Sequence, residues 1–260
     1  MDTKKQKISV LGCGWLGFPL AIHLEKTHIL KGSTTSEDKK DHLKSNHIAP
    51  FVIDIDSLNT DCEFFNTDIL IIAITSKNIE SFQKLVSEIE KSTVKKVIFI
   101  SSTSVYPASD APLTEESETL KTPLALIEQL FLSSKAFETT IIRFGGLFGG
   151  KRQPGNFFKS GKVIKNPEGV VNMIHRDDCI AIIDQVINKE SWNHIYNACA
   201  NSHPTRRAFY TKAKQNLGFE VPAFEENKSI VMKLISSEKL MRNLNYNYIH
   251  SDLLRILPLS

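Results

Sequence analysis

The stretch that decides the fold is Lys7–Gly17, KISVLGCGWLG. Its apolar residues 8–11 predict a short buried strand, and Gly12, Gly14 and Gly17 come after it in the spacing GxGxxG. A helix-compatible apolar segment comes next, and this order of strand, turn and helix is the setting in which the spacing indicates dinucleotide binding. The first glycine would make a tight turn, the second would let the backbone approach a pyrophosphate, and the third would bring the helix close to the strand. A glycine-rich turn without a ligand is the alternative.

Length and composition favour a globular protein. The 260 residues suit one large α/β unit, or a main domain with a small lobe. The net charge of +3 is too small to indicate a nucleic-acid partner. No apolar run approaches the length that crosses a membrane. The segment before Cys13 resembles an export signal, but five residues after Lys7 are too few for a signal core, so we expect it to belong to the mature fold.

The cysteines and histidines predict no metal site. The four cysteines form no CxxC pair, which argues against a zinc site or a disulfide framework. The eight histidines include neither HExxH nor a pair four residues apart. Free thiols fit a reducing compartment, so we expect a cytoplasmic protein.

Strands and helices alternate along the chain, which predicts a Rossmann-type, doubly wound parallel sheet. Residues 68–74 contain the continuous apolar run ILIIAI, typical of a strand covered on both faces. The other predicted strands are 28–33, 50–55, 94–102 and 137–144, and the predicted helices are the segment up to residue 26, 78–91 and 120–134.

The composition changes after residue 144. Residues 145–155 are rich in glycine and predict a loop at the carboxyl edge of the sheet, where ligands bind in such folds. Beyond it we expect strands at 170–174 and 195–197 and helices at 178–188 and 205–217, less regularly arranged. The predicted division is therefore an NAD(P)-binding domain over 1–150 and a small C-terminal substrate lobe over 151–260, with 174–197 returning to the Rossmann core.

The candidate cofactor-binding residues lie at or just after the carboxyl ends of predicted strands. They are Gly12, Cys13, Gly14, Trp15, Leu16, Gly17, Thr34, Thr35, Asp54, Ala73, Ile74, Thr75, Phe144 and Gly145.

The end of the second strand bears on the choice between NAD and NADP. An acidic side chain there would accept hydrogen bonds from the ribose 2′-hydroxyl, but the residues are Gly-Ser-Thr-Thr-Ser. This absence favours NADP slightly over NAD, with Lys39 or Lys40 as the source of positive charge. A solvated helix start at 36–40 is the alternative reading of these charges.

Five segments together resemble the extended short-chain dehydrogenase/reductase family, which includes nucleotide-sugar epimerases and dehydratases. They are GCGWLG, SSTSVYP (101–107), IIRFGGLFGG (141–150), IHRDDCIAII (174–183) and YNACANSHPT (196–205). GCGWLG departs from the GxxGxxG of most extended members and is similar to an atypical, epimerase/dehydratase-like branch.

The resemblance implies roles for two residues. Ser102 matches the family's Ser/Thr, whose hydroxyl would contact a substrate hydroxyl or carbonyl, although a serine at a strand end also commonly caps local backbone. Tyr106 matches a tyrosine that is usually structural in the family.

The family's acid and supporting lysine, YxxxK, precede a glutamate by eight and four residues. If Glu128 is that glutamate, the two positions are Leu120 and Leu124, and leucine cannot transfer a proton. The pair Tyr210 and Lys214 has the spacing but falls in the distal lobe, where we expect a surface helix.

Tyr106, His175 and Lys151 are the candidates to replace the missing acid, and Asp178 is expected to cap the following helix. Two hypotheses remain open. The first is an NAD(P)-dependent oxidoreductase or epimerase-like enzyme acting on a small polar or sugar-nucleotide substrate. The second is a non-catalytic NADP(H)-binding sensor or scaffold. A monomer and a homodimer are both compatible with the sequence.

Overall fold

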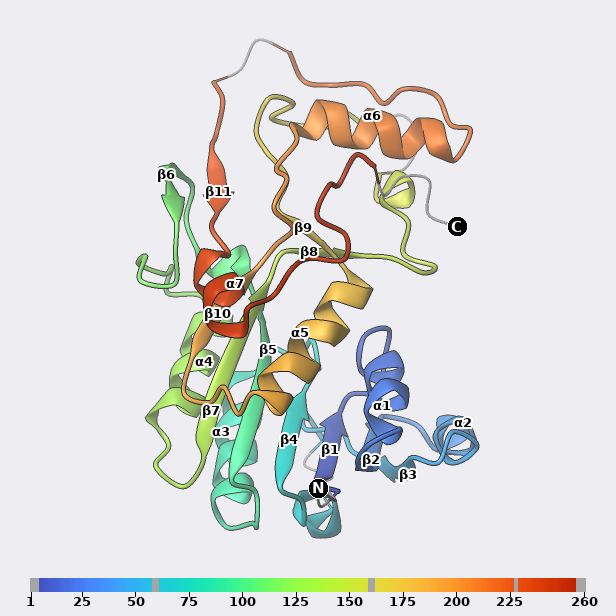
Figure 1. The fold of residues 1–260 in the computed structure, drawn as a ribbon, viewed down its shortest axis with the longest axis vertical. Helices are drawn as coiled ribbons and strands as arrows, with labels where there is room; N and C mark the ends of the chain where they lie inside the picture. The colour runs from blue at the N-terminus through green and yellow to red at the C-terminus, as the bar shows by residue number, and fades with distance from the viewer. Residues whose placement is uncertain (1–4, 58–60, 159–161, 227–228, 256–260) are drawn as a thin grey trace. The chain divides into compact units, whose positions relative to one another are not determined.

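The computed structural model describes residues 5–255, except 58–60, 159–161 and 227–228. Its main feature is a seven-stranded parallel sheet in the order β10-β7-β5-β4-β1-β2-β3 (Figure 1). The order reverses beside β1, which pairs with β2 on one side and β4 on the other. This confirms the predicted doubly wound sheet. The strands are β1 (Lys7–Leu11), β2 (Ile29–Thr34), β3 (Ala49–Val52), β4 (Ile69–Ile72), β5 (Lys96–Ser102), β7 (Glu138–Phe144) and β10 (Ile195–Ala198).

The chain divides into two compact units, each built from three segments. Unit 1 comprises Met1–Ser101, Lys121–Ile142 and Ile183–Ile195. Unit 2 comprises Ser102–Leu120, Arg143–Ile182 and Tyr196–Ser260.

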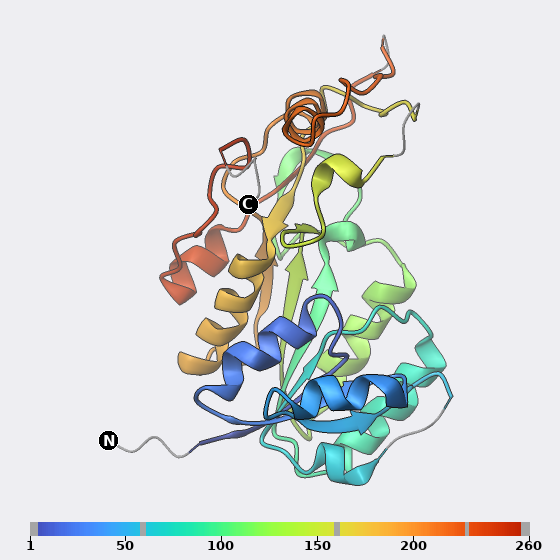
Figure 2. The same cartoon turned by 90° about the vertical axis from the view of Figure 1, so that its right-hand side faces the viewer.

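In unit 1, helices cover both faces of the sheet. Side chains alternate along a strand, so Val10 faces α1 (Gly17–Glu25) while Leu11 joins the core under α3 (Ile79–Glu90). Figure 2 shows α1 and α3 on opposite sides of the sheet. All four residues of β4 are buried, as the continuous apolar run predicts.

The helix starts of unit 1 depend on short polar side chains. Asn78 accepts the Ser81 N–H at the start of α3. Thr122 accepts the Ala125 N–H at the start of α4 (Pro123–Ser133), which packs beside α3. The alternative reading of residues 36–40 as a solvated helix start agrees with η1 (Glu37–Lys39) and α2 (Lys40–Lys44). The extent of α2 was not predicted, because this helix buries only Leu43 and shows no helical period. The remaining short helix is η2 (Cys62–Phe65).

Unit 2 contains two small parallel ladders, β6 with β11 and β8 with β9. Strand β8 lies within the predicted loop 145–155, because the Gly146 N–H bonds the Asn172 carbonyl and brings the chain beside β9. The elements are η3 (Thr103–Val105), β6 (Ser109–Leu113), β8 (Gly146–Phe148), η4 (Pro154–Asn156), β9 (Met173–His175), α6 (Arg206–Asn216), β11 (Lys233–Ile235) and α7 (Glu238–Leu244). Helix α5 (Arg176–Asn188) contributes residues to both units. Within the described residues, no helix has the length and apolar character needed to span a membrane.

Candidate functional site

The first glycine of the turn has a conformation that other residues rarely adopt. Gly12 has φ +97°, and a Cβ there would lie 2.9 Å from the Ala73 carbonyl oxygen and 2.6 Å from Ile74 Cγ2. Its N–H donates to Ser33 Oγ at 2.9 Å. The end of β1 is thus held between β2 and the residues after β4, so Gly12 lies directly against the predicted Ala73 and Ile74.

The third glycine joins α1 to the turn. A Cβ on Gly17 would lie 2.1 Å from the Gly12 carbonyl oxygen, a distance that no side chain can occupy. Helix α1 begins here without a side-chain cap from the buried Leu16 and without an acidic residue in its first turn. The first turn of α1 therefore places no carboxylate at the positive end of the helix dipole, which suits an anionic ligand.

The second glycine faces open space. Gly14 is exposed, and a Cβ there would meet no atom within 4 Å. Its neighbour Trp15 is half-buried. The space beside Gly14 is open, so a pyrophosphate could approach the backbone there.

Cys13 holds the turn against β2 through its backbone N–H and its side chain. Its N–H donates to the Ser33 carbonyl at 2.8 Å, and its Sγ lies 2.7 Å from where a Cβ on Gly32 would be. Burial raises the pKa of the Cys13 thiol to about 12. The thiol is therefore a packing group, and only the backbone of Cys13 remains a candidate for ligand contact.

Thiol labelling tests this arrangement. With a pKa of about 12, only about 1 in 10,000 Cys13 side chains is thiolate at pH 8. Burial raises the pKa of Cys199 to about 12 and that of Cys179 well above its usual value, and Cys62 is exposed. We expect one fast-reacting thiol per native chain with an aromatic disulfide reagent, and none in Cys62→Ser. Fast labelling that survives in Cys62→Ser would contradict the buried position of Cys13.

The ends of β2 and β3 lie in the same unit as the turn. Thr34 is buried and its carbonyl accepts the Ile53 N–H, whereas Thr35 is exposed. The Oγ of Ser36 is buried and has no hydrogen-bond partner within the described residues. Sequence reasoning did not select Ser36, although its position at the strand tip was a usable signal. Its free hydroxyl fits a ligand with a polar group at this tip.

Two further predicted positions in unit 1 come just after β3 and β4. Asp54 is half-buried, and its Oδ1 accepts the Asp56 N–H at 3.0 Å, closing a local turn. The Ala73 N–H donates to the Leu11 carbonyl, and Thr75 is exposed. Unit 1 therefore brings together Gly12, Ala73 and Ile74 in direct contact.

The remaining predicted residues belong to unit 2. Ser102 is half-buried at the end of β5, and its Oγ accepts the Ser104 N–H at 3.1 Å. This is the local capping geometry, and the hydroxyl hydrogen remains available for donation. Phe144 is buried, and Gly145 allows close packing against the Asn172 carbonyl and Cys199.

Tyr106 is part of a buried polar cluster. Its hydroxyl donates to Asn197 Oδ1 at 2.9 Å and accepts from Arg143 Nη1 at 2.5 Å. Burial raises the pKa of Tyr106, and the charge of Arg143 opposes that shift only in part. A phenol with both hydrogen-bonding roles occupied and a raised pKa acts as a structural group. Arg143 and Asn197 were missed because single polar residues inside apolar strands show no pattern.

His175 lies at the end of β9 and is buried. It contacts His250, with ring centroids 3.9 Å apart, and Phe148 at 5.2 Å. Burial lowers the pKa of His175, and the nearby His250 lowers it further. Lys151 is exposed in a turn.

The expectation that Asp178 caps the helix is wrong. Asp178 is fully buried in the first turn of α5, and its carboxylate accepts bonds from Tyr246 Oη at 2.7 Å, the Ile249 N–H at 2.7 Å and the His250 N–H at 3.0 Å. The carboxylate points to a distant segment because that segment supplies three donors to this fully buried group.

The two leucines at the positions of the family's acid and lysine have different surroundings. Leu120 is 45% exposed in unit 2, and its N–H donates to the Val105 carbonyl. In unit 1, Leu124 packs against the core of α3 and α4. Glu128 is fully buried in the same unit and accepts a 2.5 Å hydrogen bond from Ser101 Oγ.

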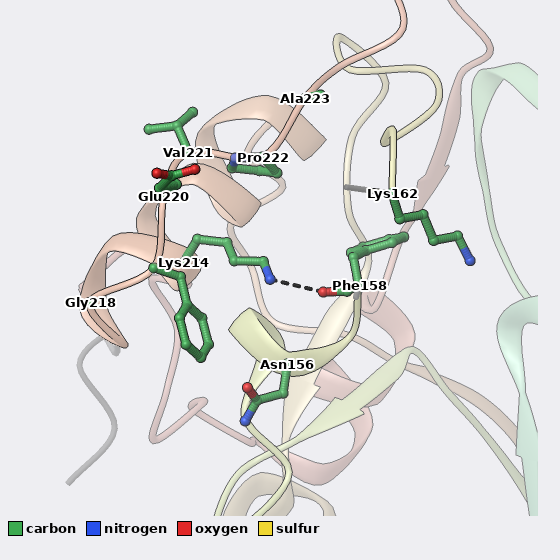
Figure 3. A pocket seen from close by; sticks show the side chains of 10 residues that line it. Asn156, Phe158, Lys162, Lys214, Gly218, Glu220, Val221, Pro222 and Ala223 are labelled. Carbon is green, nitrogen blue, oxygen red and sulfur yellow. Dashed lines mark hydrogen bonds between the residues drawn. The ribbon is translucent and has the colours of Figure 1, made fainter. Parts of the chain in front are cut away.

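The other tyrosine–lysine pair serves packing. Helix α6 lies at the surface as expected, with Ala208, Lys212 and Gln215 exposed, and Tyr210 and Lys214 lie on its buried face. Lys214 Nζ donates to the Phe158 carbonyl at 2.8 Å, across a pocket of about 780 Å³ (Figure 3). The pocket is lined by η4, the end of α6 and residues 218–223, and none of the predicted cofactor or catalytic residues lines it.

The sheet reversal beside β1 and the glycine turn that opens α1 define a Rossmann-type dinucleotide-binding fold. A family model described as the NAD dependent epimerase/dehydratase family matches residues 29–145. Protein YeeZ of Escherichia coli K12 is 30% identical over 279 residues, covering 98% of this chain and 99% of the relative.

Solved structures agree in fold. A UDP-glucuronic acid 4-epimerase from Bacillus cereus, in complex with UDP-glucuronic acid and NAD, superimposes with a TM-score of 0.77 at 18% identity, covering 96% of each chain. A short-chain dehydrogenase/reductase superfamily protein from Agrobacterium tumefaciens with bound NAD has a TM-score of 0.75 at 17% identity, covering 96% of this chain and 95% of the other. The chain belongs to the NAD-dependent epimerase/dehydratase family.

Proposed function

We propose that this protein is an NAD(P)-dependent, epimerase-like enzyme that acts on a sugar nucleotide or another small polar substrate. The observation that carries the proposal is the glycine turn. Close contacts leave no room for a side chain at Gly12 or Gly17, whereas Gly14 is exposed and faces open space. The first turn of α1, which follows, contains no acidic residue. That combination is what a bound pyrophosphate requires. The thiols, all free, support a cytoplasmic location.

The residues at the carboxyl end of β2 also suit a bound cofactor. No carboxylate stands at Thr34–Ser36, and the buried Ser36 Oγ offers an unused hydrogen bond. Lys40 is paired with Glu37 at 3.2 Å, and Lys39 is exposed. We therefore propose a preference for NADP, with Ser36 and Lys39 contacting the 2′-phosphate, although the Agrobacterium tumefaciens and Bacillus cereus structures hold NAD.

After the cofactor binds, the chain's own residues position the substrate. The bound nicotinamide ring supplies a hydride acceptor or donor. Ser102 would hold a substrate hydroxyl through its remaining donor, while its oxygen stays fixed by the Ser104 N–H. Leu120 and Leu124 supply no proton, so the acid is another group. Because Tyr106 is occupied by Arg143 and Asn197, substrate-held water or substrate hydroxyls are the proposed source.

Gly14→Ala tests the cofactor site without disturbing the fold. The added methyl enters open space, so the melting temperature of the free protein should stay within about 1–2 °C of wild type, as for a neutral surface change. The same methyl displaces the pyrophosphate, so the Kd for the preferred dinucleotide should rise about tenfold or more. Titration calorimetry with NAD and NADP measures both the loss and the preference. Unchanged affinity in Gly14→Ala would contradict the proposed pyrophosphate position.

Turnover is tested separately. Wild type, Gly14→Ala and Ser102→Ala are incubated with UDP-hexoses and UDP-glucuronic acid plus dinucleotide, and products are monitored by nicotinamide absorbance and by NMR of the sugar protons. We expect conversion by wild type and a loss in both variants, with cofactor affinity retained in Ser102→Ala. If the protein binds a dinucleotide but converts none of these sugar nucleotides, the proposal that it is an enzyme is contradicted.

A second candidate function is a non-catalytic NADP(H) sensor or scaffold. Leucine at both proton-transfer positions favours it, since neither the 45% exposed Leu120 nor Leu124, which is packed against the core, can transfer a proton. Turnover that Ser102→Ala abolishes would exclude this alternative.

A further inference from the structure

Three side chains with metal-ligating atoms converge in unit 2. They are His175 at the end of β9, Asp177 in the first turn of α5, and His250 after α7. One ligand atom from each lies within 4.8 Å of the others. Asp177 Oδ2 is 3.5 Å from His175 Nδ1 and 3.5 Å from His250 Nε2. Residue 250 is far from the other two in sequence, which is why spacing did not predict the cluster.

The scaffold fixes both imidazoles. Asp178 accepts the Ile249 and His250 N–H groups and so holds the segment that carries His250. Gly149, with φ +118°, lets the backbone pass beside His175, since a Cβ there would lie 2.6 Å from its Nε2. The other ring nitrogen, Nδ1, is thereby directed to Asp177. Orientation of this kind is what ligating histidines require from their surroundings.

The hydrogen bonds within the cluster are incomplete. The Nε2 of His250 is buried and has no hydrogen-bond partner within the described residues. His175 Nδ1 accepts only a long bond of 3.3 Å from the Asp177 N–H. An unpaired buried nitrogen is costly unless something binds it.

We propose that His175 Nδ1, His250 Nε2 and an Asp177 carboxylate oxygen bind a divalent transition-metal ion of the Zn²⁺ or Co²⁺ type. A tetrahedral ion with bonds of about 2.1 Å separates its ligand atoms by about 3.4 Å. The two separations from Asp177 Oδ2, both 3.5 Å, match this value, and the two imidazole nitrogens lie within 4.8 Å of each other. Mixed imidazole and carboxylate ligands suit zinc and cobalt better than magnesium or calcium, which prefer oxygen alone.

The fourth position would face solvent, because the Asp177 side chain is 52% exposed whereas the His175 side chain is 8% exposed. A site with three protein ligands and one open position can bind water or a substrate oxygen. The metal proposal rests on unit 2 alone, and it stands or falls independently of the proposed cofactor.

The test uses the full chain freed of metal by chelation, with Cys62→Ser as background so that no exposed thiol competes. Titration with Zn²⁺ by calorimetry should give one ion per chain, and Co²⁺ should develop the visible absorption of a tetrahedral complex. Asp177→Asn and His250→Asn should each weaken Zn²⁺ binding at least about tenfold. His47→Asn, which removes an exposed histidine elsewhere and suits the positive φ of that position, should bind like the background.

Circular dichroism confirms that each variant is folded, and Mg²⁺ should produce no binding heat. Saturable one-to-one binding that depends on Asp177 and His250 supports the site. Absence of saturable Zn²⁺ binding, or binding that is equal in Asp177→Asn, His250→Asn and His47→Asn, overturns it.

Discussion

Gly17→Ala is expected to lower the free energy of unfolding by about 3 kcal/mol. The added Cβ would lie 2.1 Å from the Gly12 carbonyl oxygen and 3.3 Å from Val10 Cγ1. Backbone atoms cannot rotate away as a side chain can, so α1 must move off β1 and the packing between them opens. Urea denaturation monitored by circular dichroism measures the loss.

The control is Gly14→Ala, three residues earlier in the same turn, where a Cβ meets nothing within 4 Å. It should change the free energy of unfolding by no more than about 0.5 kcal/mol. If Gly17→Ala were as stable as Gly14→Ala, the close approach of α1 to the turn would be wrong.

Asp178→Ala is expected to cost about 4 kcal/mol, because it leaves one buried and two partly buried donors without their acceptor. The donors are the Tyr246 hydroxyl and the N–H groups of Ile249 and His250. Asp178→Asn keeps one acceptor oxygen and should lose less. The effect is read from urea midpoints, together with the onset of proteolysis after residue 244.

Asp110→Asn serves as the matched control, since Asp110 is exposed on β6 of the same unit. Its unfolding free energy should match wild type to within about 0.5 kcal/mol. An Asp178→Ala protein as stable as Asp110→Asn would show that the carboxylate does not hold the segment 246–250.

The sequence predicts the sheet well because each central strand carries its own signal. The run at 69–72 is buried on both faces, and the helix 79–90 has a clear apolar stripe and an Asn cap. GxGxxG directly after β1 was sufficient to place the turn, because the steric demands on Gly12 and Gly17 arise from neighbours close to one strand–turn–helix unit.

The elements that were missed depend on partners distant in sequence. Strand β6 contains Pro112, which lacks an N–H and disfavours a strand, and it exists because β11 pairs with it. The role of Asp178 depends on the segment around residue 249, and no local pattern encodes that contact. The same long-range contact brings His250 close to His175, so the spacing of histidines in the sequence could not predict the metal-ligating cluster.

The division of the chain into units has a consequence for its synthesis. In sequence order the segments alternate strictly between unit 1 and unit 2, starting at Met1–Ser101 and ending at Tyr196–Ser260. Unit 1 is incomplete until residue 195 has left the ribosome, and unit 2 is incomplete until the last segment has been made. A growing chain that has not reached residue 195 therefore contains neither unit whole. Such nascent chains should depend on chaperones to keep the apolar faces of the early strands from associating.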